Sequence, residues 1–172
     1  CGTFGKTLMA DAIIQTGSEA DIRQATDLLN EIIQLGGTTA ITSPLSRDVL
    51  ESWLMSNPGR AIWHVATNHG GDLLGFQWVG PWDGVPAEAC EISTFVKADR
   101  TGHGIGSRLF DATRLAAEEM GYAWIHAAIR ADNTGGLAYY QSRGFRTFGR
   151  KDDVLLDDGT KVSKVLTRYD LK

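Results

Sequence analysis

The stretch RTGHGIGS, residues 100–107, decides the fold, because glycine takes every second position from 102 to 106. Residues 89–96 before it have the pattern of a strand, and the residues after it begin an amphipathic helix. Glycine allows a backbone to turn tightly and to approach a ligand closely. The first N–H groups of a helix have no partner inside it, so the loop predicts a phosphate or pyrophosphate site. An ordinary glycine turn is the alternative.

Two other phosphate-binding loops fit this stretch less well. A Walker loop would place Gly-Lys-Ser/Thr at the start of the helix, where Gly106, Ser107 and Arg108 stand. A dinucleotide-binding G-x-G-x-x-G motif would need glycine at the position of Ser107, near the start of a βαβ repeat. The loop therefore favours a third kind of phosphate-binding site.

The rest of the chain predicts one α/β (α+β) domain. The predicted strands are 12–15, 61–66, 73–79, 89–96, 124–129, 146–150 and 162–169. The predicted helices are about 18–36, 46–57, 105–120 and 134–143. We expect a single central mixed, mostly antiparallel sheet flanked by about four helices. Residues 1–8, CGTFGKTL, precede Met9 and are interpreted as an expression remnant or upstream extension, with the domain at 9–172.

Composition excludes several classes of function. A net charge of −4 argues against a nucleic-acid surface, which needs a basic face. No apolar run reaches the length of a transmembrane helix, so no membrane partner is expected. The two cysteines, Cys1 and Cys90, predict no structural disulfide and favour a reducing, cytoplasmic compartment. The four histidines lack metal-ligand spacing, so no metal is expected.

Two motifs carry a family resemblance. The segment 95–106, FVKADRTGHGIG, resembles the Y-V-x-P-x-x-R-G-x-G-I-G signature of the GNAT (GCN5-related) N-acetyltransferase superfamily, with Ala98 and Thr101 as departures. The segment 131–145, ADNTGGLAYYQSRGF, is similar to its N-x-x-A-x-x-L-Y-E-K-x-G-F motif, with Gly136 in place of alanine. The two motifs stand in the family's order, separated by a helix and a strand.

The resemblance implies acetyl-CoA as co-substrate. Main-chain amides of the glycine loop would hold its pyrophosphate, Asn133 would lie beside the pantetheine arm, and Tyr140 would lie beside the thioester sulfur as the acid. Tyr139 is predicted to be a core residue instead. The cofactor-binding residues implied are Phe95, Val96, Thr101, Gly102, His103, Gly104, Ile105, Gly106, Ser107, Asn133 and Tyr140.

The acceptor side resembles the phosphinothricin and amino-acid N-acetyltransferase subgroup. Segments 36–46, GGTTAITSPLS, and 91–96, EISTFV, carry this likeness and make Glu91 the candidate general base. A base is needed because an alkylamine of pKa about 10.4 is protonated at neutral pH. An outward-facing or ion-paired role for Glu91 is the alternative. The predicted substrate-binding residues are Thr38, Thr39, Trp78, Trp82 and Glu91, while Trp53 and Trp63 are predicted in the core.

The sequence thus predicts an acetyl-CoA-dependent N-acetyltransferase acting on a primary amine of a small molecule, an amino acid or related compound. Direct attack on the thioester would place negative charge on an oxygen near the main-chain N–H of Phe95 or Val96. A protein or peptide acetyltransferase and a catalytically weak acyl-CoA-binding module are the alternatives. The resemblance also implies a homodimer. A thiol nucleophile at Cys90 has no histidine paired with it in the sequence.

Overall fold

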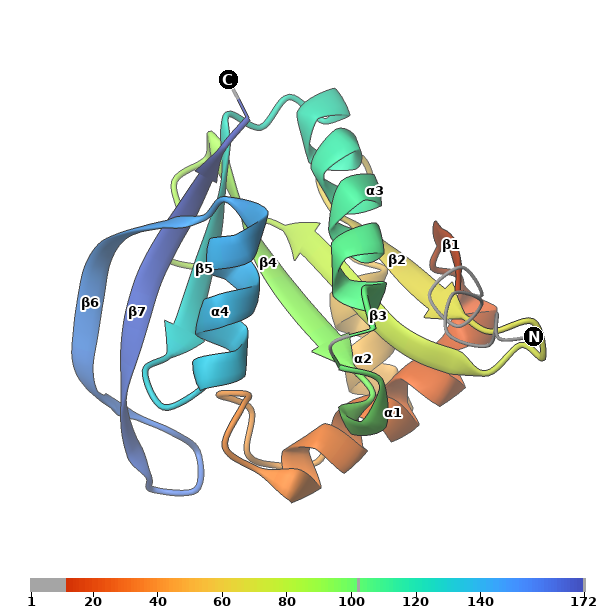
Figure 1. The fold of residues 1–172 in the computed structure, drawn as a ribbon, viewed down its shortest axis with the longest axis horizontal. Helices are drawn as coiled ribbons and strands as arrows, with labels where there is room; N and C mark the ends of the chain where they lie inside the picture. The colour runs from red at the N-terminus through yellow and green to blue at the C-terminus, as the bar shows by residue number, and fades with distance from the viewer. Residues whose placement is uncertain (1–11, 102, 172) are drawn as a thin grey trace, which may run out of the picture.

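Seven strands form one mixed sheet in the computed structural model, which describes residues 12–101 and 103–171 (Figure 1). The strand order is β1-β2-β3-β4-β5-β7-β6, and every neighbouring pair is antiparallel except β4 and β5. The strands are β1 Ile13–Thr16, β2 Ile62–Thr67, β3 Leu73–Gly80, β4 Ala89–Val96, β5 Trp124–Arg130, β6 Arg146–Leu155 and β7 Lys161–Asp170. The predicted mixed, mostly antiparallel sheet is confirmed. The proposed extension at residues 1–8 lies outside the described residues.

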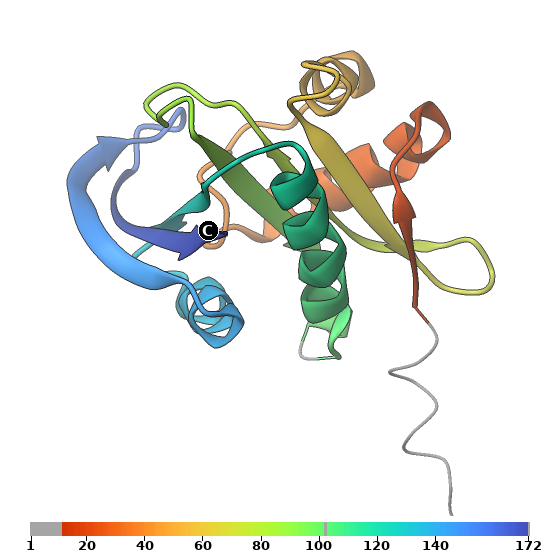
Figure 2. The ribbon, with the colours of Figure 1, turned by 90° about the horizontal axis from the view of Figure 1, so that it is seen from above.

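Helices cover both faces of this sheet. They are α1 Ile22–Leu35, α2 Arg47–Leu54, α3 Ile105–Glu119 and α4 Thr134–Arg143. Figure 2 shows α1 and α2 on one side and α3 and α4 on the other. The predicted capping signal at Ser18 is present, because its main-chain N–H donates to the Asp21 carboxylate at 2.9 Å, and a 3-10 turn, Glu19–Asp21, leads from it into α1. Every residue of β3 is buried, which follows from its central place between these layers.

The last two strands are longer than the sequence predicts. Predicted strands 146–150 and 162–169 extend to β6 and β7, around the predicted turn at Gly159. Bulges interrupt the pairing of β6 between Thr147 and Gly149 and between Lys151 and Val154. As an edge strand exposed along most of its length, β6 lacks the alternation of apolar and polar residues that a half-buried strand shows.

The sheet divides between β4 and β5. These parallel strands pair only at Ala89–Trp124, Cys90–Ile125 and Glu91–His126, although both continue for several residues beyond. Figure 1 shows the two strands separating, with the α1–α2 loop below the opening. Residues 92–96 of β4 therefore pair with β3 alone. This fork positions the site.

Cys90 gives the fold a testable response to alkaline pH. Burial, followed by the neighbouring Glu91 carboxylate, raises the pKa of the Cys90 thiol to about 12. The unfolded chain loses this proton near the ordinary thiol value of about 8.5, so stability is lost as pH rises from about 9 towards 12. In the wild type this thiol should make the unfolding free energy fall by up to about 1.4 kcal/mol for each pH unit. We expect Cys90→Ala to lose this contribution, so that its unfolding free energy, measured by urea unfolding between pH 8 and 10, falls less steeply with pH. Equal slopes in both proteins would contradict this account. The raised pKa also argues against a Cys90 nucleophile.

Candidate active site

A cleft of about 1980 Å³ follows the fork. It is bordered by β4, β5, the α1–α2 loop, the starts of α3 and α4, and residues of β6 and β7. The predicted site residues that line it are Thr38, Thr39, Trp82, Glu91, Phe95, Val96, Thr101, Gly104, Ile105, Gly106, Ser107, Asn133 and Tyr140. His103 and Trp78 are not among the lining residues, and Gly102 lies outside the described part of the chain.

At one end of the cleft, helix α3 presents uncapped amides. Gly104 is its N-cap, at φ +81°, and as a glycine it has no side chain to cap the helix. The first amide with an acceptor inside the helix is that of Arg108, which donates to the Gly104 carbonyl at 3.1 Å. A Cβ on Gly106 would lie 2.7 Å from the ring of Tyr139, so glycine there permits close packing of α3 against α4. The free amides and the positive end of the helix suit a diphosphate.

Two tyrosines of α4 join one hydrogen-bond network. The hydroxyl of Tyr140 lies 2.8 Å from Thr94 Oγ1 on β4, and that of Tyr139 donates to the Gly106 carbonyl at 2.7 Å. The amide of Gln77 donates to Thr94 at 2.8 Å and to Tyr139 at 3.0 Å. Burial raises the pKa of both tyrosines, that of Tyr139 to about 12, so both stay protonated at neutral pH.

The prediction that Tyr139 is the core residue of the pair needs correction. Tyr140 is the more buried, at 8% exposed, and packs in the core against Phe145. Tyr139 is half-buried and bonded at the cleft. Consecutive helical residues point about 100° apart, so the two rings reach different parts of the cleft wall, and sequence cannot say which is deeper.

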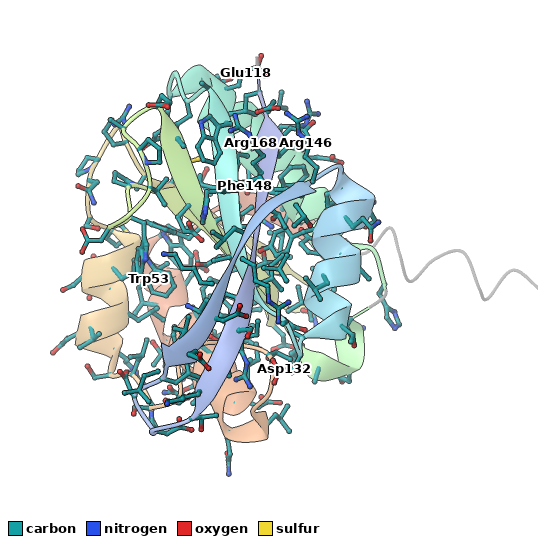
Figure 3. The ribbon with its side chains drawn as sticks, turned by 90° about the vertical axis from the view of Figure 1, so that its left-hand side faces the viewer. Trp53, Glu118, Asp132, Arg146, Phe148 and Arg168 are labelled. Atoms are coloured by element: carbon teal, nitrogen blue, oxygen red, sulfur yellow. The ribbon has the colours of Figure 1, made fainter. Side chains whose placement is uncertain are left out.

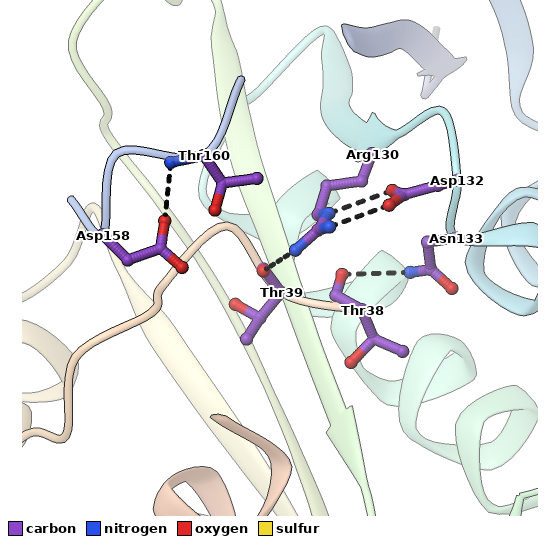
Figure 4. Close-up of polar contacts among 7 residues, drawn as sticks. All are labelled: Thr38, Thr39, Arg130, Asp132, Asn133, Asp158 and Thr160. Carbon is purple, nitrogen blue, oxygen red and sulfur yellow. Dashed lines mark hydrogen bonds and ion pairs between the residues drawn. The ribbon is translucent and has the colours of Figure 1, made fainter. Parts of the chain in front are cut away.

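The α1–α2 loop is fastened across the other side of the cleft (Figure 4). The guanidinium of Arg130 donates to the Thr39 carbonyl at 3.0 Å and forms an ion pair with Asp132 at 2.8 Å. The amide of Asn133 donates to the Thr38 carbonyl at 3.1 Å. Sequence reasoning missed Arg130. Its signal was a cation at the end of an apolar strand, three residues before the asparagine of the second motif.

Tryptophans line the cleft differently from the prediction. Trp82 is 53% exposed and lies 6.2 Å from Trp53, between ring centroids, and both face the cleft. Trp53, predicted in the core, is partly buried and packs against the core, 5.5 Å from Trp78 between ring centroids, and it also lines the cleft. Trp78 was predicted to bind substrate, yet it is 1% exposed and packs against the core under α1 and α2. Its position on the central strand explains this burial. Trp63 is in the core, as predicted.

Glu91 and His126 meet at the fork. Glu91 is 8% exposed, and its Oε2 lies 2.5 Å from Nδ1 of His126. The other oxygen, Oε1, accepts the main-chain N–H of Ala128 at 3.3 Å. His126 lines the cleft and was missed as a site residue, because register between parallel strands joined by a helix cannot be counted from sequence.

The described residues contain neither a cluster of metal ligands nor a membrane-spanning helix. Within residues 12–101 and 103–171, His, Cys, Asp and Glu side chains nowhere gather in threes as metal ligands do. In the same residues, helices long and apolar enough to cross a membrane are not found.

Solved structures share this fold. An N-acetyltransferase from Staphylococcus aureus Mu50 superposes with a TM-score of 0.84 at 24% identity, covering 94% of this chain and 99% of that one. A GNAT superfamily phosphinothricin acetyltransferase from Sinorhizobium meliloti, solved with acetyl-CoA, gives a TM-score of 0.82 at 19% identity, covering 93% of this chain and 88% of that one. These likenesses show that the chain has the same fold as both of these proteins.

Sequence comparison then identifies the family. The chain belongs to the acetyltransferase (GNAT) family, whose profile matches residues 26–145. An L-methionine sulfoximine/L-methionine sulfone acetyltransferase from Pseudomonas aeruginosa is 28% identical over 151 residues, covering 83% of this chain and 85% of that protein. The chain is an acetyl-CoA-dependent N-acetyltransferase, which confirms the predicted family, enzyme class and co-substrate.

Proposed function

We propose that this enzyme acetylates the primary amine of a small amino acid or a closely related molecule. The observation that carries the proposal is the fastened α1–α2 loop. Bonds from Arg130 to Thr39 and from Asn133 to Thr38 hold it across the cleft. A peptide needs an open groove along which its chain can continue away from the reacting amine. A loop held across the cleft favours a small acceptor instead.

Charge inside the cleft supports an acceptor that also carries an anionic group. Lys151 on β6 and Lys164 on β7 are opposite each other in register, and both line the cleft. Like charges in this arrangement disfavour strand pairing. Within the described residues neither ammonium has an ion-pair partner, so a carboxylate of the substrate would relieve the repulsion. The Pseudomonas relative is named for substrates of this amino-acid kind.

The proposed chemistry uses the fork and both walls of the cleft. Glu91 with its hydrogen-bond partner accepts the proton that the amine must lose. Main-chain N–H groups of β4 beyond the fork, near Phe95 and Val96, stabilise the negative charge that develops on the thioester oxygen. The Tyr140 hydroxyl gives a proton to the departing thiolate. Two observations support this role for Tyr140: burial keeps its hydroxyl protonated, and the hydroxyl is hydrogen-bonded to Thr94 at the cleft wall.

Tyr140→Phe is expected to lower kcat about 10-fold without abolishing it. A thiol of pKa about 8.5 leaves readily as the thiolate, so protonation gives only modest help. Thiol release under saturating acetyl-CoA measures kcat, and Tyr139→Phe is the matched control. A loss beyond about 10³-fold, or no loss at all, would contradict the assigned role.

A panel of amines with acetyl-CoA tests the function. Free amino acids and their sulfoximine and phosphinic analogues should be acetylated, and peptides carrying the same amino termini should not. Turnover of peptides in preference to free amino acids would favour the protein acetyltransferase. Binding of acetyl-CoA without turnover on any amine would favour the weak binding module. The homodimer implied by the resemblance and the cytoplasmic location favoured by the low cysteine content stay predictions.

A further inference from the structure

The Glu91 carboxylate is turned towards β5. Glu91 and His126 form the last register pair before β4 and β5 separate. One carboxylate oxygen is 2.5 Å from Nδ1 of His126, and the other accepts the N–H of Ala128. Each oxygen thus already has a hydrogen-bond partner on β5. The carboxylate is placed to orient a neighbour rather than to meet an amine directly.

The imidazole of His126 has one nitrogen left for the substrate. An ionised carboxylate only accepts hydrogen bonds, so Nδ1 carries the hydrogen and Nε2 keeps its lone pair. The ring lies 5.9 Å from that of Trp124 and 5.6 Å from that of Phe148, between centroids. These contacts fix its plane, and in the described part of the chain Nε2 has no hydrogen-bond partner. An oriented imidazole that lines the cleft with a free lone pair is a proton acceptor.

The remaining charged groups near the ring are already paired. From β7, Arg168 is the register partner of His126, with its guanidinium 4.1 Å from the Trp124 ring centroid and 2.7 Å from Asp170. Arg146 of β6 also pairs with Asp170. Phe148 of β6 and Arg168 of β7, both labelled in Figure 3, lie against the same Trp124 ring, whose centroid is 6.0 Å from that of Phe148 and 4.1 Å from the guanidinium carbon. The Glu91 carboxylate is therefore the charged group that is hydrogen-bonded to the His126 imidazole.

We propose that Nε2 of His126 takes the proton of the acceptor amine, and that Glu91 orients the ring and stabilises the imidazolium. This inference rests on the proposed function. In the step, the amine nitrogen forms a bond to the thioester carbon, and the C–S bond breaks with its electron pair on sulfur. The ammonium first loses one proton to solvent through Nε2, which frees the nitrogen to attack. After the attack a second N–H proton passes to Nε2, and the thiolate gains a proton from Tyr140. Solvent then takes the proton from His126 and returns one to the tyrosine.

An imidazole suits this task better than a lone carboxylate. In model peptides histidine titrates at about 6.5 and glutamate at about 4.3, and a general base works best near the operating pH. The pair resembles in its logic the carboxylate–histidine couple of serine proteases, in which the carboxylate fixes the tautomer. Sequence alone hides the pair, since 34 residues separate its members.

Two measurements on His126→Gln test the proposal. Glutamine can still bond to Glu91 but cannot accept a proton at neutral pH, so kcat/KM should fall about 10- to 100-fold. The acidic limb of the wild-type pH profile should disappear, and acetyl-CoA affinity should stay within about twofold. His69→Gln, on the exposed β2–β3 turn, is the control and should match wild type. An unchanged profile shape would overturn the proposal, as would a loss explained by weaker acetyl-CoA binding. Should His126→Gln not fold, His126→Asn takes its place.

The tautomer gives a readout that does not depend on turnover. Nitrogen-15 NMR of the wild-type enzyme should show His126 protonated at Nδ1, with this preference lost in Glu91→Gln. Protonation at Nε2 alone would overturn the inference even if the enzyme acetylates amino acids. Conversely, if free amino acids were not acetylated, the proposed function would be overturned, but the tautomer of His126 measured by NMR would still stand.

Discussion

Ser107→Asp is expected to weaken acetyl-CoA binding by about 100-fold while leaving the fold intact. Ser107 is in the first turn of α3 and lines the cleft beside the uncapped amides. An aspartate there places a negative charge where the diphosphate is predicted to bind. Two unit charges about 5 Å apart repel by about 3 kcal/mol at an effective dielectric constant of 20, which corresponds to two powers of ten in affinity. Calorimetric titration with acetyl-CoA measures the change.

The same substitution should not destabilise the helix, so weaker acetyl-CoA binding can be distinguished from a loss of folding. Acidic residues in the first turn stabilise a helix through its dipole, so the melting temperature should stay level or rise slightly. Ser107→Ala is the matched control and should keep the wild-type affinity within a few-fold, because the amides rather than the hydroxyl are proposed to hold the ligand. Unchanged acetyl-CoA affinity in Ser107→Asp would show that the diphosphate does not bind at the start of α3.

Local sequence patterns were sufficient to predict the helix start on the cofactor side of the cleft. The glycine loop predicts a helix start with free amides because this property depends on residues adjacent in sequence: Gly104, the N-cap of α3, adopts φ +81° and has no side chain to cap the helix. Asn133, which was predicted only to lie beside the pantetheine arm, is the N-cap of α4, where its side chain accepts the N–H of Gly136 at 2.9 Å. Most strands and helices follow from the same local periodicity.

The acceptor side depends on contacts between distant segments, and there the prediction was wrong for Trp78 and missed Arg130. Trp78 and Trp82 are four residues apart, yet one is in the core and the other faces the cleft, because β3 ends at Gly80. Arg130 reaches the loop at Thr39 only after β5 has taken its place in the sheet. Neither outcome follows from residue type or spacing.

The fork explains why Glu91 could be predicted from the sequence as a site residue and its partner His126 could not. Glu91 was conspicuous as a charge within an apolar strand, whereas His126 belongs to a strand in which a half-buried imidazole is unremarkable. The pair forms because β4 and β5 end their pairing at these two residues. A site that depends on where two strands stop pairing is visible only in three dimensions.

Glu91→Gln is expected to lower kcat/KM by about 10³-fold, more than Tyr140→Phe or His126→Gln. Glutamine fills the same space and can still accept the Ala128 N–H, so the fold should be retained. It removes the negative charge, and its amide can donate to Nδ1, which would move the imidazole hydrogen to Nε2 and block proton transfer. By contrast, loss of His126 leaves a carboxylate that can act through water, which is why we expect the smaller effect there.

The measurement is kcat/KM across pH 6–9, with acetyl-CoA binding followed separately. Glu88→Gln makes the same chemical change at an exposed position three residues earlier, and it should match wild type. Since the two variants share their change in net charge, any difference between them comes from the place of the carboxylate at the fork. A Glu91→Gln enzyme with wild-type kcat/KM throughout this range would show that the amine loses its proton elsewhere.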